Sequence, residues 1–241
     1  GMVVLSADHP GDALPDWLTA QQVDDRTNET NRVGDAHLVL HALLSGHPEI
    51  PAAITEMADA DRVALAGHSY GAYTAYATAA GARGVSPHER VRAVIGFQPF
   101  MRTMSDALLR RVEVPSLLVC AELDTVTPPH IDSDRAWELL PGRPSWRLDL
   151  AGCGHQAVSD IALYAELAAD VPALPQLVRD YLAATVAGSA GPGTRPWRDA
   201  MAVQVAVTWA FLQVAFGDDS AGGSAAADVL AAGPGVRLHR R

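Results

Sequence analysis

The sequence contains no lysine, since all 18 of its basic residues are arginine. Without lysine the chain has no P-loop lysine for phosphates, no amine for a Schiff base or for pyridoxal phosphate, and no kinase lysine. It has only two cysteines, Cys120 and Cys153, which are too few for a disulfide scaffold or a four-thiolate zinc site. These absences exclude several large classes of enzyme and of small secreted domain.

Positive charge is also scarce. The 28 acidic and 18 basic residues give a net charge of −10 at pH 7, which repels polyanions, so nucleic acid and anionic membrane surfaces are not expected as partners. No transmembrane segment is expected either, because the longest apolar run, 202–216, is interrupted by polar residues and is typical of a core helix. No histidine and carboxylate cluster shows metal-ligand spacing, so no metal and no cofactor are expected.

What is present is a globular composition: 241 residues, of which 49% are hydrophobic, enough for one large domain with a buried core. We expect one domain over residues 1–218, followed by a short helix and a flexible tail over 219–241. The apolar residues 2–5 predict that the chain opens in a strand, one that lies at a sheet edge unless segments precede it. Localisation and oligomeric state stay open.

Short apolar runs alternate with segments of helical periodicity along most of the chain. The expected strands cover 62–66, 91–97, 114–121 and 145–150, and the expected helices cover 32–44, 72–82, 106–111, 133–140, 160–169, 176–186 and 202–216. No strand is expected after residue 159. This alternation predicts an α/β fold in which a mostly parallel sheet carries helices on both faces.

One short motif carries chemistry. Gly67-His68-Ser69-Tyr70-Gly71 matches G-x-S-x-G and lies between an expected strand and an expected helix. Two glycines in such a turn let the backbone fold sharply enough to expose Ser69 at the end of the strand, with the N–H of Tyr70 facing a developing oxyanion. We expect His68 to pack beside the nucleophile and to line the substrate pocket. The alternative is a glycine turn that only packs a helix against a sheet.

A serine hydroxyl is a weak nucleophile at neutral pH and needs a histidine base that a carboxylate orients. Asp124 follows the strand that ends at Ala121, and His155 follows the strand that ends at Leu150. The chain order of serine, aspartate and histidine is the order of the α/β-hydrolases. The sequence therefore predicts a triad of Ser69, Asp124 and His155.

Other residues compete for these roles. Glu122 is the alternative acid, but it lies closer to the end of its strand than Asp124 does. His9 and His130 are expected in loops that face the same pocket, and each is an alternative to His155 as the base. Cys120 and Cys153 each lie close before a triad residue in the sequence. They are expected as two buried free thiols, and a disulfide between them is the alternative.

The elbow around Ser69, the loop around Asp124 and the segment from Gly154 to Asp160 together resemble the α/β-hydrolases related to dienelactone hydrolase and platelet-activating-factor acetylhydrolase, a group that borders the cutinase-like polyesterases. The resemblance covers residues 2–218. It implies an esterase acting on a small-molecule or lipid-like ester, with Phe100 lining the acyl pocket. Residues 8–12 match the loop after the family's fourth strand.

The chain departs from that family in two ways. Its members carry three further strands before the one that opens this chain, and the loop after the third supplies the second oxyanion-hole donor. A chain without that loop is expected to lose on the order of 10²–10³ in rate. Dienelactone hydrolases have cysteine where this chain has Ser69. The alternative functions are a non-catalytic binding module of the same fold, and a thioesterase or amidase using the same triad.

Overall fold

The computed structural model describes residues 2–218, 225, 227–229 and 231–241. Its elements follow one another along the chain as α1 (Leu14–Thr19), α2 (Asp25–Ser45), α3 (Ala52–Thr55), β1 (Val63–His68), α4 (Tyr70–Ala80), β2 (Val91–Phe97), α5 (Asp106–Leu109), β3 (Ser116–Ala121), α6 (Pro129–Leu139), β4 (Ser145–Leu150), α7 (Ile161–Ala168), α8 (Gln176–Ala187), α9 (Trp197–Ala215) and β5 (Val236–Arg240).

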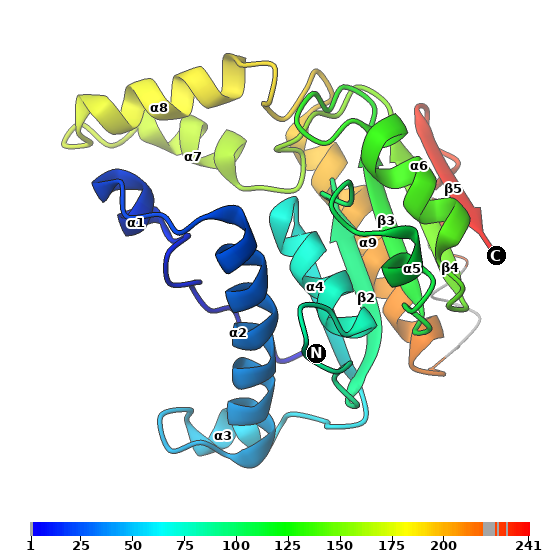
Figure 1. Cartoon of the computed structure of the whole chain (residues 1–241). Coiled ribbons are helices and arrows are strands. Elements are labelled where there is room, and N and C mark those ends of the chain that lie inside the picture. The colour runs from blue at the N-terminus through cyan, green and yellow to red at the C-terminus, as the bar shows by residue number, and fades with distance from the viewer. Residues whose placement is uncertain (1, 219–224, 226, 230) are drawn as a thin grey trace.

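The strands form one five-stranded sheet in the order β1-β2-β3-β4-β5 (Figure 1). Pairings from β1 to β4 are parallel, and β5 runs antiparallel to β4. The expectation of an α/β fold with a mostly parallel sheet is therefore confirmed. The carboxyl ends of the parallel strands meet at one edge of the sheet, and the loops that carry the predicted triad leave from that edge.

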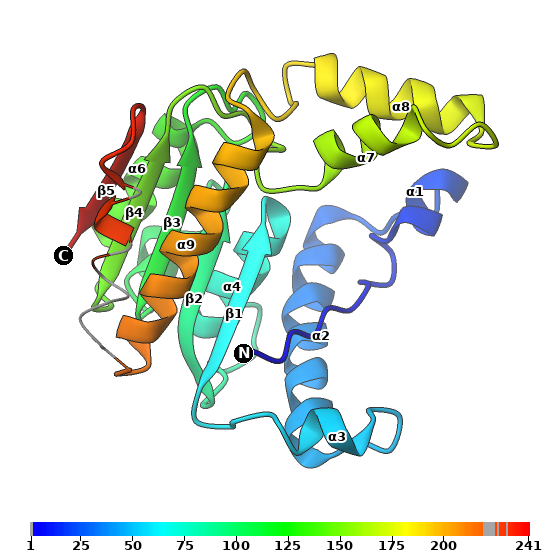
Figure 2. The ribbon, with the colours of Figure 1, turned by 180° about the vertical axis from the view of Figure 1, so that it is seen from behind.

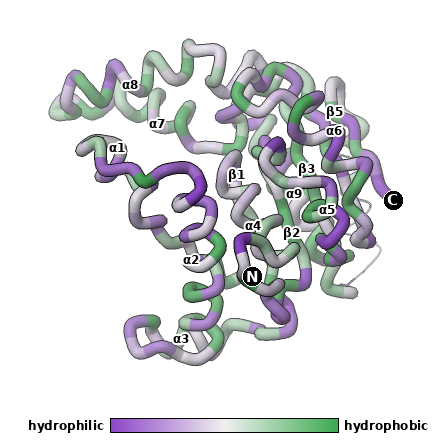
Figure 3. Tube along the Cα trace, in the orientation of Figure 1, coloured by the Kyte–Doolittle hydropathy of each residue, from purple (hydrophilic) through white to green (hydrophobic). Residues whose placement is uncertain are grey.

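Two hydrophobic clusters cover the two faces of the sheet because alternate strand residues point to opposite sides. Val94 and Leu118 face the cluster built with α2, α4 and α6, whereas Ile95 and Val119 face the cluster built with α9. Figure 2 shows α9 crossing the sheet on the side opposite α4. Hydrophobic colour is concentrated in β2 and β3, and β5 is mainly hydrophilic (Figure 3).

The first residues of the chain differ from the expectation. Residues 2–9 have no regular secondary structure, and Met2 and Val4 are 51% and 86% exposed, so the predicted opening strand is wrong. A strand needs a neighbour for its backbone hydrogen bonds, and among the described strands β1 pairs only with β2. The following loop also contains α1, which the sequence did not indicate, and α2 begins seven residues before the helix expected at residue 32.

The end of the chain also differs. Residues 236–240 form β5, so the expectations of no strand after residue 159 and of a flexible tail there are wrong. Val236 and Leu238 alternate with polar residues, and His239 pairs with Asp149 on the neighbouring strand. The short helix expected after residue 218 falls in part on residues 219–224, 226 and 230, which lie outside the described residues.

The two cysteines are buried free thiols, as expected, and no disulfide joins them. Cys120 belongs to the cluster on the α4 face of the sheet and Cys153 to the cluster on the α9 face. Burial raises the pKa of Cys120 to about 12 and the pKa of Cys153 to about 11. Both thiols are therefore protonated and packed as small hydrophobic groups.

Candidate active site

Ser69 occupies the turn between β1 and α4. Its backbone angles are φ 55° and ψ −117°, a strained conformation for a residue with a side chain. Four backbone hydrogen bonds hold it there: its N–H donates to the Phe97 carbonyl at 2.9 Å, and its own carbonyl accepts from Ala72 at 3.0 Å, Phe100 at 3.1 Å and Tyr73 at 3.4 Å. The strain is thus maintained by the end of β2 and the first turn of α4.

The two glycines of the motif have different roles. A Cβ atom on Gly67 would lie 2.2 Å from the Gly71 carbonyl group, a distance that no side chain tolerates. A Cβ atom on Gly71 would meet nothing within 4 Å. Gly67 is therefore required by the close approach of strand and helix, whereas Gly71 is not required by packing.

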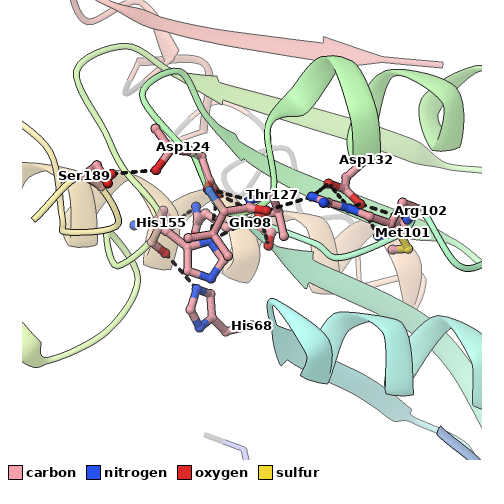
Figure 4. A network of polar contacts seen from close by, with 12 residues as sticks. His68, Gln98, Met101, Arg102, Asp124, Thr127, Asp132, His155 and Ser189 are labelled. Atoms are coloured by element: carbon pink, nitrogen blue, oxygen red, sulfur yellow. Dashed lines mark hydrogen bonds and ion pairs between the residues drawn. The ribbon is translucent and has the colours of Figure 1, made fainter. Parts of the chain in front are cut away.

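Asp124 and His155 lie together in the loops after β3 and β4 (Figure 4). His155 Nδ1 is 2.9 Å from Asp124 Oδ2, and the two residues are 5% and 4% exposed. The other carboxylate oxygen accepts from the backbone N–H groups of Val126 at 2.9 Å and Thr127 at 2.8 Å. Because the carboxylate accepts the Nδ1 proton, Nε2 of a neutral His155 ring is left as the basic nitrogen.

The ionised form of Asp124 is favoured although the residue is buried. Burial acts to raise the pKa of this carboxyl, but the hydrogen bonds from His155 and Thr127 outweigh it and lower the pKa below its ordinary value. A carboxylate that stays charged can both fix the tautomer of His155 and stabilise its protonated form.

His68 connects the loop after β4, which carries His155 and is called the base loop below, to the turn around Ser69, which is called the elbow. Its Nε2 lies 2.7 Å from the carbonyl oxygen of His155, and the two rings are 4.6 Å apart between centroids. Burial, followed by the neighbouring His155, lowers the pKa of His68 to about 4, so His68 is neutral and donates this hydrogen bond. Within the part of the chain that is described, the partly exposed Ser69 forms no side-chain hydrogen bond with His155.

Aromatic rings flank the elbow. The Tyr70 and Phe100 rings meet edge to face at 5.4 Å, and the guanidinium groups of Arg32 and Arg102 lie over them at 5.0 Å and 5.1 Å. Tyr70 is the first residue of α4, so its N–H has no acceptor within the helix. Burial raises the pKa of the Tyr70 phenol to about 12, so the phenol itself stays uncharged.

The competing candidates lie elsewhere. Glu122 accepts a hydrogen bond from the Gly152 N–H at 3.0 Å rather than from a histidine. His9 pairs with Asp35 on α2 at 2.8 Å. His130 lines a hollow of about 530 Å³ on the β5 side of the acid loop, which Glu122 also lines.

Four residues that the sequence did not single out support the loops around Asp124. Thr127 bonds to the carboxylate, Gln98 accepts from the Thr127 hydroxyl, and the buried Asp132 holds Arg102, whose guanidinium also donates to the Val126 carbonyl at 2.7 Å (Figure 4). The spacing Asp124-x-x-Thr127 is typical of a side-chain-capped turn and was a readable signal. No sequence signal joins Arg102 to Asp132, which lies 30 positions away.

The base loop is also held from the segment that follows α8. Gly154 and Gln156 donate backbone hydrogen bonds to the carbonyls of Pro192 and Gly191, at 2.9 Å and 3.2 Å. Thr125 in the acid loop donates its hydroxyl to the Ser189 carbonyl at 3.0 Å. The acid loop and the base loop therefore share one support, although α7 and α8 separate it from His155 in sequence.

The described residues show neither a metal site nor a membrane-spanning helix. Among them no group of three histidine, cysteine or acidic side chains is placed to hold a metal ion. None of the described helices has the length and apolar character needed to cross a bilayer. A scan against the patterns of known protein families finds no match, and a search of curated proteins finds no significant relative.

Proposed function

We propose that the protein is a serine hydrolase of the α/β-hydrolase type that cleaves carboxylic esters. The observation that carries this proposal is the buried hydrogen bond of 2.9 Å between Asp124 and His155, on a loop that His68 ties to the strained Ser69 elbow. Strained backbone of this kind gathers at reactive residues, where a nucleophile is held out of its relaxed conformation.

In the proposed reaction His155 Nε2 accepts the proton of Ser69 as the serine oxygen attacks the ester carbonyl. The protonated ring then gives that proton to the leaving alcohol, and a water molecule repeats the sequence on the acyl-enzyme. Asp124 keeps the proton on Nδ1 and stabilises the imidazolium. The described structure has no hydrogen bond between Ser69 and His155, so the reaction requires the Ser69 side chain to rotate until its hydroxyl reaches Nε2. Catalytic hydrogen bonds of this kind often form only when substrate is bound.

The Tyr70 N–H, at the N-terminus of α4, is the group that stabilises the negative charge developing on the carbonyl oxygen. Tyr70 and Phe100 provide an aromatic surface next to this point, and His68 closes the side toward the base. This aromatic surface suits a small or lipid-like ester, and the guanidinium groups of Arg32 and Arg102 lie over its two rings. A thioester or an amide would be cleaved by the same groups, since the acyl-transfer steps are shared.

A second candidate is a non-catalytic module of the same fold that binds a ligand or a partner. The observation that favours it is the missing hydrogen bond between the Ser69 hydroxyl and His155 in the described structure. The two candidates differ in chemical reactivity, because only an activated serine reacts with electrophilic phosphorus and turns over esters.

The test is labelling with a fluorophosphonate probe together with turnover of short p-nitrophenyl esters. The proposal expects wild type and Ser86→Ala to label and turn over, because Ser86 is an exposed loop serine, and Ser69→Ala to do neither. Labelling that persists in Ser69→Ala would reject Ser69 as the nucleophile. An unreactive wild type would support the binding module. Thioester and anilide analogues then rank the leaving groups.

A further inference from the structure

We propose that Thr127 is a positioning residue for the Asp124–His155 pair. Its hydroxyl hydrogen-bonds the same carboxylate oxygen that His155 contacts, and thereby controls the strength of the hydrogen bond between Asp124 and His155. This inference rests on the proposed function for its catalytic meaning. The hydroxyl group and the ring nitrogen that it faces are placed by the structure itself (Figure 4).

The Thr127 hydroxyl has three polar neighbours. Its oxygen lies 2.8 Å from Asp124 Oδ2, 2.9 Å from the Gln98 carbonyl oxygen and 3.2 Å from His155 Nδ1. Thr127 is 2% exposed, so water does not substitute for any of these contacts from the bulk solvent. Its backbone N–H donates to Asp124 Oδ1 at 2.8 Å, which fixes the residue against the same carboxylate.

The Thr127 hydroxyl has fewer protons than it has neighbouring acceptors. A hydroxyl has one proton and two lone pairs, whereas the carboxylate and the carbonyl only accept. The Nδ1 proton of His155 is directed at Asp124 Oδ2, and the Thr127 oxygen can accept a share of it. The hydroxyl proton itself goes either to Asp124 or to the Gln98 carbonyl, and it cannot serve both fully.

Donation of the hydroxyl proton to Asp124 suits a neutral His155 ring, and donation to Gln98 suits a protonated one. With a neutral ring, donation to Asp124 satisfies a buried carboxylate. When the ring becomes an imidazolium, donation to Gln98 instead leaves more of the carboxylate charge for His155. No bond is made or broken in this change, because only the hydroxyl rotates between acceptors that are both already in place.

Gln98 is suited to act as the fixed acceptor. It lies directly after β2, is 1% exposed and has a φ angle of 40°, which is rare for a residue with a side chain. Its N–H donates to the Val119 carbonyl at 2.8 Å. Its side chain lies 3.4 Å from that of Gln204, which in turn donates to the Ala157 carbonyl at 2.9 Å in the segment after His155.

The charged and titratable groups around Asp124 come from three other elements. His155 and the neutral His68 lie on one side, and Arg102 interacts with the carboxylate from the loop after β2. None of these groups replaces the Thr127 hydroxyl, because His155 already contacts Asp124 Oδ2 and Arg102 donates to Asp132 and to the Val126 carbonyl.

The experiment compares Thr127→Val, which keeps the shape of the side chain and removes the hydroxyl, with Thr127→Ser, which keeps the hydroxyl. Thr30→Val is the matched control, since the exposed Thr30 hydroxyl donates to the Arg26 carbonyl within α2, away from the site, and the variant should keep the wild-type resonance, kcat and KM. Two readouts are used: the Nδ1 proton resonance of His155 in protein labelled with ¹⁵N-histidine, and kcat and KM for p-nitrophenyl acetate.

For Thr127→Val we expect the His155 Nδ1 proton to exchange faster with water and its resonance to move upfield, because the hydrogen bond to Asp124 is less well held. We expect kcat to fall about tenfold and KM to change less than about twofold, the pattern of a lost transition-state interaction. Thr127→Ser should stay within about twofold of wild type in both constants.

A Thr127→Val protein with wild-type resonance and kcat would overturn the proposal, as would a Thr127→Ser protein that behaves like Thr127→Val. If the valine variant loses its circular dichroism signal, Thr127→Ala replaces it, since it adds no bulk. If wild type turns over no ester and does not label at Ser69, the proposed function fails, and the resonance alone then decides the role of Thr127.

Discussion

His68 and His155 are joined by a hydrogen bond of 2.7 Å from the His68 ring to the His155 backbone carbonyl. The contact spans 87 positions of sequence and links the residue before Ser69 to the loop that carries the base. The spacing between the proposed nucleophile and the proposed base therefore depends on a side chain that takes no part in the proposed proton transfer. This link connects the turn that holds Ser69 to the loop that holds His155.

The first prediction concerns the stability of the protein in acid. The pKa of His68 is about 4 in the folded protein, against an ordinary value of 6.5, so the unfolded chain binds more protons between these values. Stability is therefore lost as the pH falls from about 6.5 to about 4, by up to about 3 kcal/mol from this residue. A glutamine in place of His68 would not titrate and can still donate to the carbonyl.

Urea unfolding of wild type and His68→Gln at pH 7 and pH 4.5 measures this contribution. The free energy of unfolding should fall less between the two pH values in His68→Gln than in wild type. Equal losses in the two proteins would contradict the assignment of a neutral, partly buried His68.

The second prediction separates the two glycines of the elbow. Gly67→Ala places a methyl group 2.2 Å from the Gly71 carbonyl and should lower the free energy of unfolding by about 3 kcal/mol or more, with loss of activity. Gly71→Ala meets nothing within 4 Å and lies inside α4, so it should be neutral or stabilise by up to about 1 kcal/mol. Chemical denaturation of both variants checks this, and similar effects would contradict the close approach.

The third prediction concerns the choice between Asp124 and Glu122. Asp124→Asn should reduce kcat on p-nitrophenyl esters by on the order of 10³–10⁴, because an amide no longer selects the tautomer with Nδ1 protonated. Glu122→Gln removes a carboxylate that, among the described residues, accepts the Gly152 N–H and does not contact His155, so it should leave kcat within about twofold. Steady-state kinetics decide between them, and the reverse order of effects would make Glu122 the acid.

The fourth prediction concerns the ion pair between Asp132 and Arg102. Asp132 is fully buried and accepts the backbone N–H groups of Met101 and Arg102 as well as the guanidinium. Asp132→Asn should lower the free energy of unfolding by about 2 kcal/mol, a value discounted because Arg102 is partly exposed.

The matched control is Asp106→Asn. Asp106 pairs with Arg135 but is 54% exposed, so its loss should change the free energy of unfolding by less than about 1 kcal/mol. Thermal or urea unfolding of both variants provides the measurement. A loss as large in Asp106→Asn as in Asp132→Asn would show that burial of the Arg102 pair is not what stabilises the loop.

Much of the fold was readable from the sequence because its signals are local. The strands at 91–97 and 145–150 were predicted with the bounds that the structure has, since short apolar runs between turns depend only on neighbouring residues. The alternating pattern of Val236-Arg237-Leu238-His239-Arg240 is also a local strand signal, although it follows a long Gly- and Ala-rich segment. The prediction of a strand at residues 2–5 is wrong because a strand needs a neighbouring strand for its backbone hydrogen bonds, and the local pattern does not show whether one is present.

The sequence by itself determined the kinds of residue that the site can contain: one serine in a glycine turn, an aspartate and a histidine after later strands, and no lysine. Only the tertiary structure decided that Asp124 rather than Glu122 meets His155, that His68 ties the base loop to the elbow, and that Thr127 and Gln98 support the carboxylate. The reason is that hydrogen bonds depend on distances of about 3 Å. Residues 30 to 90 positions apart reach such distances only when the parallel strands bring their carboxyl ends to one edge of the sheet.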